Sequence, residues 1–278
     1  MSLLRRERVE LKTPDQIRSM RASGLVTASA LSSVRSALVA GAVAGSVDAL
    51  ARSAIREAGA EPNFLGYDGY PASICLSIND VVVHGIPDAQ VLRPGDVASV
   101  DCGCVLDGWH SDSAITVGVG AESGAVDPRS ELLVQVTRTA LWDGIAAFAR
   151  ASFVGEIGRA IEASVNGAEP SFGVLREYVG HGIGTSMHMA PEVVNFASRD
   201  RGPRVQPGMV LAIEPMVVEG SIATSTDTDG WTVRTVDGAR AAHWEHTVAR
   251  TEKGVWVLTE PDGGAAELSA RGIDIAPL

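Results

Sequence analysis

The segment 99–115 constrains the fold of this chain more than any other part of the sequence. It reads SVDCGCVLDGWHSDSAI and has Asp107-Gly108 near its centre. This dipeptide is a strong signal for a type I′ turn, in which two residues connect antiparallel strands. Such a loop places Leu106 opposite Trp109. The sequence therefore predicts a β-hairpin with a defined register, because a slip of one residue would move every side chain to the other face.

The predicted register brings two carboxylates together. Counting outward from the turn, Gly103 faces Asp112 and Asp101 faces Ala114. Because side chains alternate along a strand, Asp101 and Asp112 share one face as diagonal neighbours, about 7–8 Å apart. Gly103 leaves room between them. Two such acids in an apolar sheet require a shared proton, a basic partner or a cation. The alternative, two solvated acids on an exposed face, is disfavoured by the apolar neighbours Ala98, Val100, Ala114, Ile115 and Val117.

Two more candidate ligands stand in segments of unusual composition. His181 lies among the glycines of 180–184, which allow the backbone to approach another segment closely. Glu214 closes the apolar run 209–213 directly before a proline, an unusual place for an acid that is neither paired nor bound to metal. A second histidine, His188, follows seven residues after His181.

The last candidate ligand is Glu245, in a strand predicted over 242–248. Glu245 shares a face with His243 and Thr247, whereas His246 points to the other face, so we prefer Glu245 as the site residue. The complete set contains four carboxylates and one imidazole, and such an oxygen-rich set suits a pair of divalent ions better than one structural zinc. Its members are Asp101, Asp112, His181, Glu214 and Glu245.

The three cysteines are not expected to form a disulfide framework, because their number is odd and the chain is long. Cys102 and Cys104 point away from Asp101 and are interpreted as small buried hydrophobes. The first ten residues lack the apolar segment of a secretory signal, and no window is apolar enough to span a membrane. A cytoplasmic protein is therefore expected. The formal charge of −11, without a basic patch, argues against nucleic-acid binding.

Helical and strand-like segments alternate twice along the chain. Helices are predicted over 13–39, 46–59, 131–150 and 156–166, and strands over 64–119 and from the last helix to about 258. This order predicts an α+β fold with two related halves around one mixed sheet. No linker separates the halves, so we expect a single domain over 1–278, with a loose tail at 264–278.

From about residue 10 to residue 258, the ordered motifs resemble the methionine aminopeptidases. The motifs are the Asp101–Asp112 pair, GHGIG with His181, His188, Ile-Glu-Pro at Glu214, Trp-Glu-His at Glu245 and NDVVVHGIP with His84. The resemblance implies the pita-bread fold, in which two pseudo-symmetric helix-helix-strand halves surround a curved, mainly antiparallel sheet. The interval from Glu214 to Glu245 is too short for the insertion of the type II enzymes, which indicates type I.

This resemblance also implies a function and a mechanism. The family removes the N-terminal methionine from nascent proteins and peptides and prefers a small second residue. The five ligands would hold two divalent ions (cobalt, manganese, iron or zinc), with Asp112 and Glu245 bridging, and an activated water would attack the first peptide bond. Glu214 would act as the general base, His188 would stabilise the tetrahedral intermediate and His84 would contact the substrate.

The resemblance further assigns a methionine pocket to Tyr67, Tyr70, Cys75, Met187 and Trp231. For each of these residues the alternative is core packing, and that alternative is strongest for Tyr67 and for the neighbouring Phe64. The chain departs from the family at two positions of this region. Met187 stands where an aromatic residue is frequent, and Phe64 stands where a cysteine is common, so both departures fall in the predicted methionine pocket and not among the metal ligands.

Two other readings stay open at this level. An aminopeptidase P or prolidase has similar ligands, but it carries a longer N-terminal domain, His-Glu in place of His188-Met189 and Glu-Pro-Gly in place of Glu214-Pro215-Met216. A non-catalytic binding protein of the same fold is disfavoured because all five ligands are present. Further expectations are a monomeric state, association with the ribosome and no contact with membranes.

Overall fold

The computed structural model describes residues 9–278. The expectation that the chain lacks a secretory signal rests on residues 1–10 and so lies almost entirely outside the described part. None of the helices within residues 9–278 combines the length and the apolar character needed to cross a membrane.

The helices occur in two pairs and a short C-terminal helix. Their bounds are α1 (Pro14–Ala37), α2 (Ala44–Glu57), α3 (Pro128–Phe148), α4 (Gly155–Asn166) and α5 (Ala265–Ser269), with single 3₁₀ turns η1 (Tyr67–Gly69) and η2 (Ala121–Ser123). Thr13 and Gln16 form the capping box expected at the start of α1. Helix α3 begins three residues earlier than predicted, because Asp127 caps it and Pro128 suits its first turn.

The strands form one large sheet and two small ones. The nine-stranded sheet contains β1 (Glu61–Pro62), β2 (Ile74–Ile78), β4 (Val97–Leu106), β5 (Trp109–Gly118), β7 (Gly180–Gly182), β8 (Met189–Val193), β9 (Val210–Ile213), β14 (Glu245–Arg250) and β15 (Val255–Val257). One small sheet contains β6 (Gly173–Val174), β10 (Met216–Val218) and β13 (Ala241–His243), and the other contains β3 (Val81–Val83), β11 (Thr224–Thr226) and β12 (Val233–Thr235). Every strand pair between residues 9 and 278 is antiparallel.

The central hairpin has the predicted register. Leu106 pairs with Trp109, Gly103 with Asp112 and Asp101 with Ala114. Asp107 and Gly108 both have positive φ, as a type I′ turn requires. Cys104 lies on the opposite face from the two acids and contacts the hydroxyl groups of Ser23 and Thr27 on α1.

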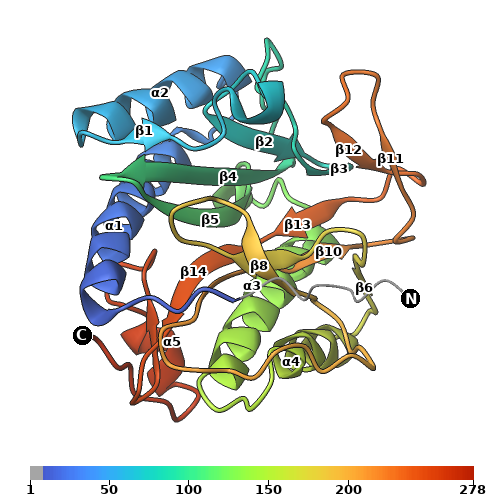
Figure 1. Cartoon of the computed structure of the whole chain (residues 1–278). Coiled ribbons are helices and arrows are strands. Elements are labelled where there is room, and N and C mark those ends of the chain that lie inside the picture. Colours follow the sequence, from blue (N-terminus) through green and yellow to red (C-terminus); the bar gives the residue numbers. More distant parts are fainter. Residues whose placement is uncertain (1–8) are drawn as a thin grey trace, which may run out of the picture.

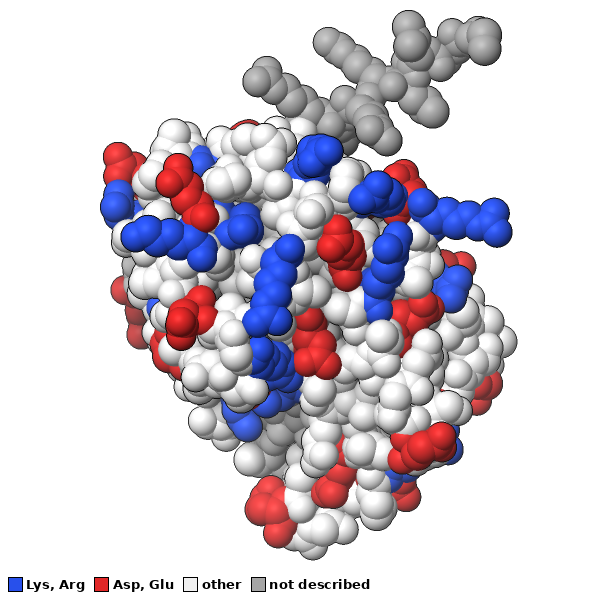
Figure 2. All heavy atoms as spheres, turned by 90° about the horizontal axis from the view of Figure 1, so that it is seen from below, with Lys and Arg blue, Asp and Glu red and all other residues white. Residues whose placement is uncertain are grey.

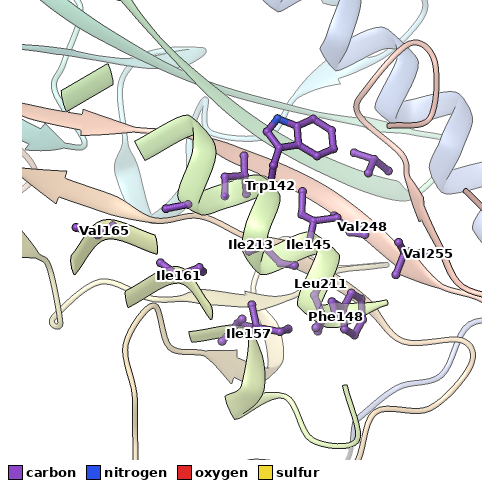
Figure 3. Close-up of a cluster of buried hydrophobic side chains, with 14 of the residues drawn as sticks. Trp142, Ile145, Phe148, Ile157, Ile161, Val165, Leu211, Ile213, Val248 and Val255 are labelled. Carbon is purple, nitrogen blue, oxygen red and sulfur yellow. The ribbon is translucent and has the colours of Figure 1, made fainter. Parts of the chain in front are cut away.

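Each half of the fold places its helix pair against its own strands (Figure 1). Helix α1 packs on β4 and β5, and α3 packs on β13 and β14. The interior of the second half is shown in Figure 3, where apolar side chains of α3 and α4 meet those of the central strands. The labelled members include Trp142, Ile145, Phe148, Ile157, Ile161, Leu211, Ile213 and Val248. This packing fixes the strands whose ends carry the candidate ligands.

Two expectations about the second half require correction. The strand predicted over 242–248 is interrupted at Trp244, because β13 pairs with β10 whereas β14 pairs with β5 and β9. The end of the chain, expected to be loose, packs instead: Leu268 and Ile273 are buried in the core cluster of the second half, and Ala276 donates its backbone N–H to Val255.

Acidic and basic side chains are mixed on the surface. Figure 2 shows Lys and Arg side chains interspersed with Asp and Glu on the face seen from below. The expectation of no nucleic-acid partner stays a prediction.

Candidate metal centre

The five predicted ligands lie on five neighbouring positions across the middle of the large sheet. Strands β4, β5, β14, β9 and β7 follow one another in the sheet. They carry, in the same order, Asp101, Asp112, Glu245, Glu214 just beyond the strand end, and His181. All five side chains line one pocket. Residues that are far apart in sequence therefore converge because their strands are adjacent.

Specific contacts hold these strands in place. The Thr247 hydroxyl accepts a hydrogen bond from the Asp112 backbone N–H at 3.0 Å and donates one to the Asp112 carbonyl at 2.8 Å. This side chain extends the pairing of β5 with β14, where Glu245 is opposite Ala114. The glycines beside His181 permit close approach: a Cβ on Gly180 would collide with the Ala212 carbonyl, and one on Gly182 with the Ala190 carbonyl.

The four carboxylates are in an environment that disfavours their charges. Burial, followed by the charges of Asp112 and Glu214, raises the pKa of Asp101 well above its ordinary value. Burial likewise raises the pKa of Asp112 to about 7. Burial and the charge of Asp112 raise the pKa of Glu214 and of Glu245. A bound cation would reverse this cost, since it favours the ionised form of each carboxylate.

Unpartnered polar atoms show that the residues fit a cation. Among the described residues, Asp101 Oδ1, Glu245 Oε1 and His243 Nε2 are buried without a hydrogen-bond partner. Buried polar atoms normally find partners, and an ion is one of the recognised explanations when they do not. Donor atoms of Asp112, His181 and Glu245 also lie within 4.8 Å of one another, as do those of Glu214, His243 and Glu245. The donors are oxygen-rich with imidazole nitrogen, which suits divalent transition metals.

His181 is oriented as a metal-binding histidine would be. Its Nδ1 lies 2.9 Å from the Gly182 carbonyl, which can only accept, so Nδ1 carries the proton. The acceptor atom is then Nε2, which is 3.5 Å from Glu214 Oε1. Burial lowers the pKa of His181 to about 3, so the ring is neutral near neutral pH, as a metal ligand must be.

An apolar pocket adjoins the carboxylates. Cys75 on β2 is directly opposite Asp101 on β4, so this pocket begins where the ligand cluster ends. Its buried wall is made by Phe64, Tyr70, Ala72, Cys75 and Met187, with Trp231 and Ile86 packed against them. The rings of Tyr70 and Trp231 meet edge to face at 5.1 Å. Phe64, which we placed in the pocket region with core packing as the alternative, is part of this wall.

Three polar side chains complete the pocket lining. Tyr67, predicted for the pocket with core packing as the alternative, is 37% exposed, and its hydroxyl lies 2.8 Å from His188 Nδ1. The His188 ring packs against that of His181 at a centroid distance of 4.4 Å. His84 follows β3 with a φ of 60°, uncommon for a residue other than glycine, and burial lowers its pKa to about 4. All twelve predicted site residues therefore line one pocket.

Sequence reasoning missed one residue at this centre. His243 is fully buried, with Nε2 at 3.7 Å from Glu214 Oε2 and 4.0 Å from Glu245 Oε2. Its shared face with Glu245 was visible in the alternation of the strand. His246, by contrast, contacts the hydroxyls of Ser113 and Thr259 away from the carboxylates, as expected.

Comparison with known proteins identifies the family. The model of metallopeptidase family M24 matches residues 18–252. The chain belongs to family M24. Within it, the chain is 51% identical over 256 residues to methionine aminopeptidase 1 of Mycobacterium tuberculosis, covering 90% of this chain and 95% of that protein. The crystal structure of methionine aminopeptidase from Thermotoga maritima matches with a TM-score of 0.86 and 39% identity, covering 91% of this chain and all of the other. The chain is thus a member of the methionine aminopeptidases of M24, of type I.

Prolidases, which are part of the alternative that we considered within M24, resemble this chain in fold but at low sequence identity. Prolidase from Pyrococcus furiosus matches with a TM-score of 0.70 at 18% identity, covering 90% of this chain but 65% of that protein. This similarity confirms the pita-bread fold.

The register of the hairpin can be tested at Gly103. A Cβ at this position would lie 2.8 Å from Asp112 Oδ1 and 2.6 Å from Asn63 Nδ2. We therefore expect Gly103→Ala to displace Asp112 and to weaken metal binding roughly tenfold or more. The matched control is Cys104→Ala on the opposite face, which should cost only ~1–2 kcal/mol of stability. Calorimetric metal titration and thermal unfolding of both variants measure the two effects. Equal losses of metal affinity in the two variants would contradict the assignment of Gly103 and Cys104 to opposite faces of the hairpin.

The raised carboxylate pKa values predict a pH-dependent effect of metal on stability. Asp112 has a folded-state pKa of about 7, against an unfolded value of about 3.9. Well below about pH 4 the group is protonated in both states and costs nothing. Between about pH 4 and 7 it ionises in the unfolded chain but keeps its proton in the metal-free fold, so that fold loses stability as pH rises, and the loss is complete above about pH 7. Mn²⁺ should therefore raise Tm more at about pH 8 than at about pH 5. Thermal scans with Mn²⁺ and with EDTA measure the rise in Tm caused by the metal at each pH. A rise in Tm that is the same at both pH values would contradict this account.

Proposed function

We propose that this chain removes the N-terminal methionine from nascent proteins and peptides, and that it does so with two divalent cations. The proposal rests on one observation, that the carboxylate cluster and the apolar wall lie side by side in the same pocket. Four carboxylates and His181 converge at one end, and the apolar wall of Phe64, Tyr70, Cys75 and Met187 lies directly beside them. A methionine side chain held against that wall would present its peptide bond to the carboxylates.

Asp101, Asp112, His181, Glu214 and Glu245 would hold the cations. Glu245 belongs to both clusters of converging donor atoms, which supports its role as a shared ligand. When bound, the cations would supply an acidified water at neutral pH and polarise the carbonyl of the first peptide bond. The cations could be cobalt, manganese, iron or zinc.

Glu214 is the residue that we assign to proton transfer. Its carboxylate lies at the end of the rigid strand β9, whose residues are fully buried, and Asn195 fixes its backbone through a hydrogen bond of 3.0 Å to the Glu214 carbonyl. A carboxylate in a low-dielectric environment is a stronger base than one in water. It would take the proton from the attacking water and pass it to the leaving amine.

His188 and His84 are assigned to the substrate. When the Tyr67 hydroxyl donates to His188 Nδ1, the neutral ring keeps its proton on Nε2, which can donate to the carbonyl oxygen that gains charge during attack. Burial lowers the pKa of His188, so the ring is neutral near neutral pH. The His84 ring meets the rings of Tyr178 and Trp231 edge to face at the pocket, and we assign it to contact the substrate backbone or the leaving group.

Tyr67, Tyr70, Cys75, Met187 and Trp231 would enclose the methionine side chain. Aromatic edges and soft sulfur atoms suit a thioether, which makes favourable contacts with both. We place the reaction in the cytoplasm, on chains leaving the ribosome, and we propose that the protein acts as a monomer.

Peptide specificity tests the proposed function. We expect Met-Ala-Ser to be cleaved and Ala-Pro-Pro to be left intact, because the apolar wall accepts a methionine side chain. Met-Ala and Met-Gly peptides should be hydrolysed at least about 10²-fold more efficiently than Met-Leu or Met-Arg peptides, a difference that steric exclusion of a large side chain can supply. The measurement is kcat/KM for each peptide. Comparable values for Met-Ala and Met-Arg would contradict the small second residue, and cleavage of Ala-Pro-Pro alone would indicate a prolidase-type enzyme.

A further inference from the structure

His243 stands at the metal centre although the mechanism above does not use it. It is the last residue of β13, and only 2% of its surface is exposed. Its Nε2 has no hydrogen-bond partner within residues 9–278. The nearest charged atoms are Glu214 Oε2 at 3.7 Å and Glu245 Oε2 at 4.0 Å. A buried imidazole nitrogen thus faces two carboxylates without bonding to either.

These separations fit shared coordination better than hydrogen bonding. Hydrogen bonds between nitrogen and oxygen are about 2.7–3.2 Å long, so neither contact qualifies. Two donors that each lie about 2.1 Å from one cation are about 3–4.2 Å apart. Both contacts of Nε2 fall in this interval, and donor atoms of Glu214, His243 and Glu245 all lie within 4.8 Å of one another.

The backbone of His243 is held firmly enough to position a ligand. The Thr116 hydroxyl accepts a hydrogen bond from the His243 N–H at 2.9 Å and donates one to its carbonyl at 2.6 Å. His243 is also paired with Met216 on β10. Thr116 lies on β5, the strand that carries Asp112, so the small sheet of β13 is fastened to the ligand-bearing strand of the large one.

We propose that His243 is a sixth protein ligand of the metal centre. Resting on the proposed function, this inference adds a second imidazole to the centre, beside that of His181. His243 would bind a cation together with Glu214 and Glu245, whose donor atoms converge with its own. Because imidazole suits zinc and iron whereas carboxylates and water suit manganese and magnesium, His243 also shifts the preference of its cation towards zinc and iron.

Ring nitrogen NMR of the zinc-loaded protein tests the inference directly. The chain has six histidines, so full ¹⁵N labelling of the rings gives a countable set of signals. With two equivalents of Zn²⁺, we expect two of them to show a metal-bound Nε2. His181→Gln and His243→Gln should each remove one such signal. His246→Gln is the matched control, because it removes a buried imidazole whose Nε2 faces Glu260 and not the four clustered carboxylates, and it should remove neither signal.

Metal affinity provides the second measurement. His243→Gln should weaken the binding of one Zn²⁺ by roughly tenfold or more, with a smaller loss for Mn²⁺. Two bound Zn²⁺ with a single metal-bound histidine, lost in His181→Gln and unchanged in His243→Gln, would overturn the inference and leave the proposed function intact. Failure of the wild-type protein to bind two Zn²⁺ would overturn the two-cation function itself.

Discussion

Removal of metal is expected to abolish peptide hydrolysis, and Mn²⁺, Fe²⁺ or Co²⁺ is expected to restore it. Without a cation, four carboxylates share a pocket in which burial and mutual repulsion raise their pKa values, so each carboxylate holds a proton more tightly and the attacking water is not activated. We expect kcat/KM for Met-Ala-Ser to fall by at least about 10²-fold, since catalytic cations contribute several kcal/mol to the transition state.

The experiment compares three samples of one preparation: as purified, treated with EDTA and dialysed, and reloaded with a single metal. Circular dichroism of the dialysed sample is the control, because lost activity has to be separated from lost fold. Metal analysis of protein purified without added metal identifies the cation bound in the cell. Full activity in exhaustively metal-free protein would refute the two-cation proposal.

Glu214→Gln is expected to reduce kcat by 10²–10⁴, the usual range for loss of a general base. Glutamine keeps the size and one carbonyl oxygen of the side chain but removes its charge and basicity. The variant should fold, since the strand before Glu214 is buried and the substitution is nearly isosteric. It should still bind at least one cation, because Asp112, His181 and Glu245 form a cluster without Glu214. KM for Met-Ala-Ser should change much less, since the methionine wall is elsewhere in the pocket.

Steady-state kinetics at saturating metal, with metal content determined on the same samples, measures both properties. Glu192→Gln is the matched control: it makes the same substitution at an exposed glutamate opposite His181, outside the pocket lining, and should leave kcat unchanged. A kcat for Glu214→Gln within about threefold of the wild-type value would show that Glu214 is not the base. A ligand role alone would instead appear as lost metal with kcat recovering at higher metal concentration.

Short-range sequence patterns were sufficient to predict the structural features that depend only on residues close together in the chain. The Asp107-Gly108 turn determines the hairpin register, because a two-residue loop fixes which residues of the two strands are paired. The proximity of Asp101 and Asp112 follows from this register. The capping box at Thr13 and the apolar run before Glu214 were read correctly for the same reason. The membership in family M24, expected from the ordered motifs, is confirmed by the match over residues 18–252.

The tertiary structure alone decided the features that depend on packing between distant segments. The interruption at Trp244 arises because β13 and β14 belong to different sheets, which no periodicity within one segment reveals. The packing of the two sheets brings His243 beside Glu214, which the alternation within 242–248 does not show. Tyr67 lines the pocket because η1 meets His188, which is 121 residues away in sequence. The tail packs because single apolar residues such as Leu268 fill space beside α3, and isolated side chains of this kind create no repeating pattern. Sequence thus determines local register and chemistry, whereas the distances between elements are set by how their faces pack.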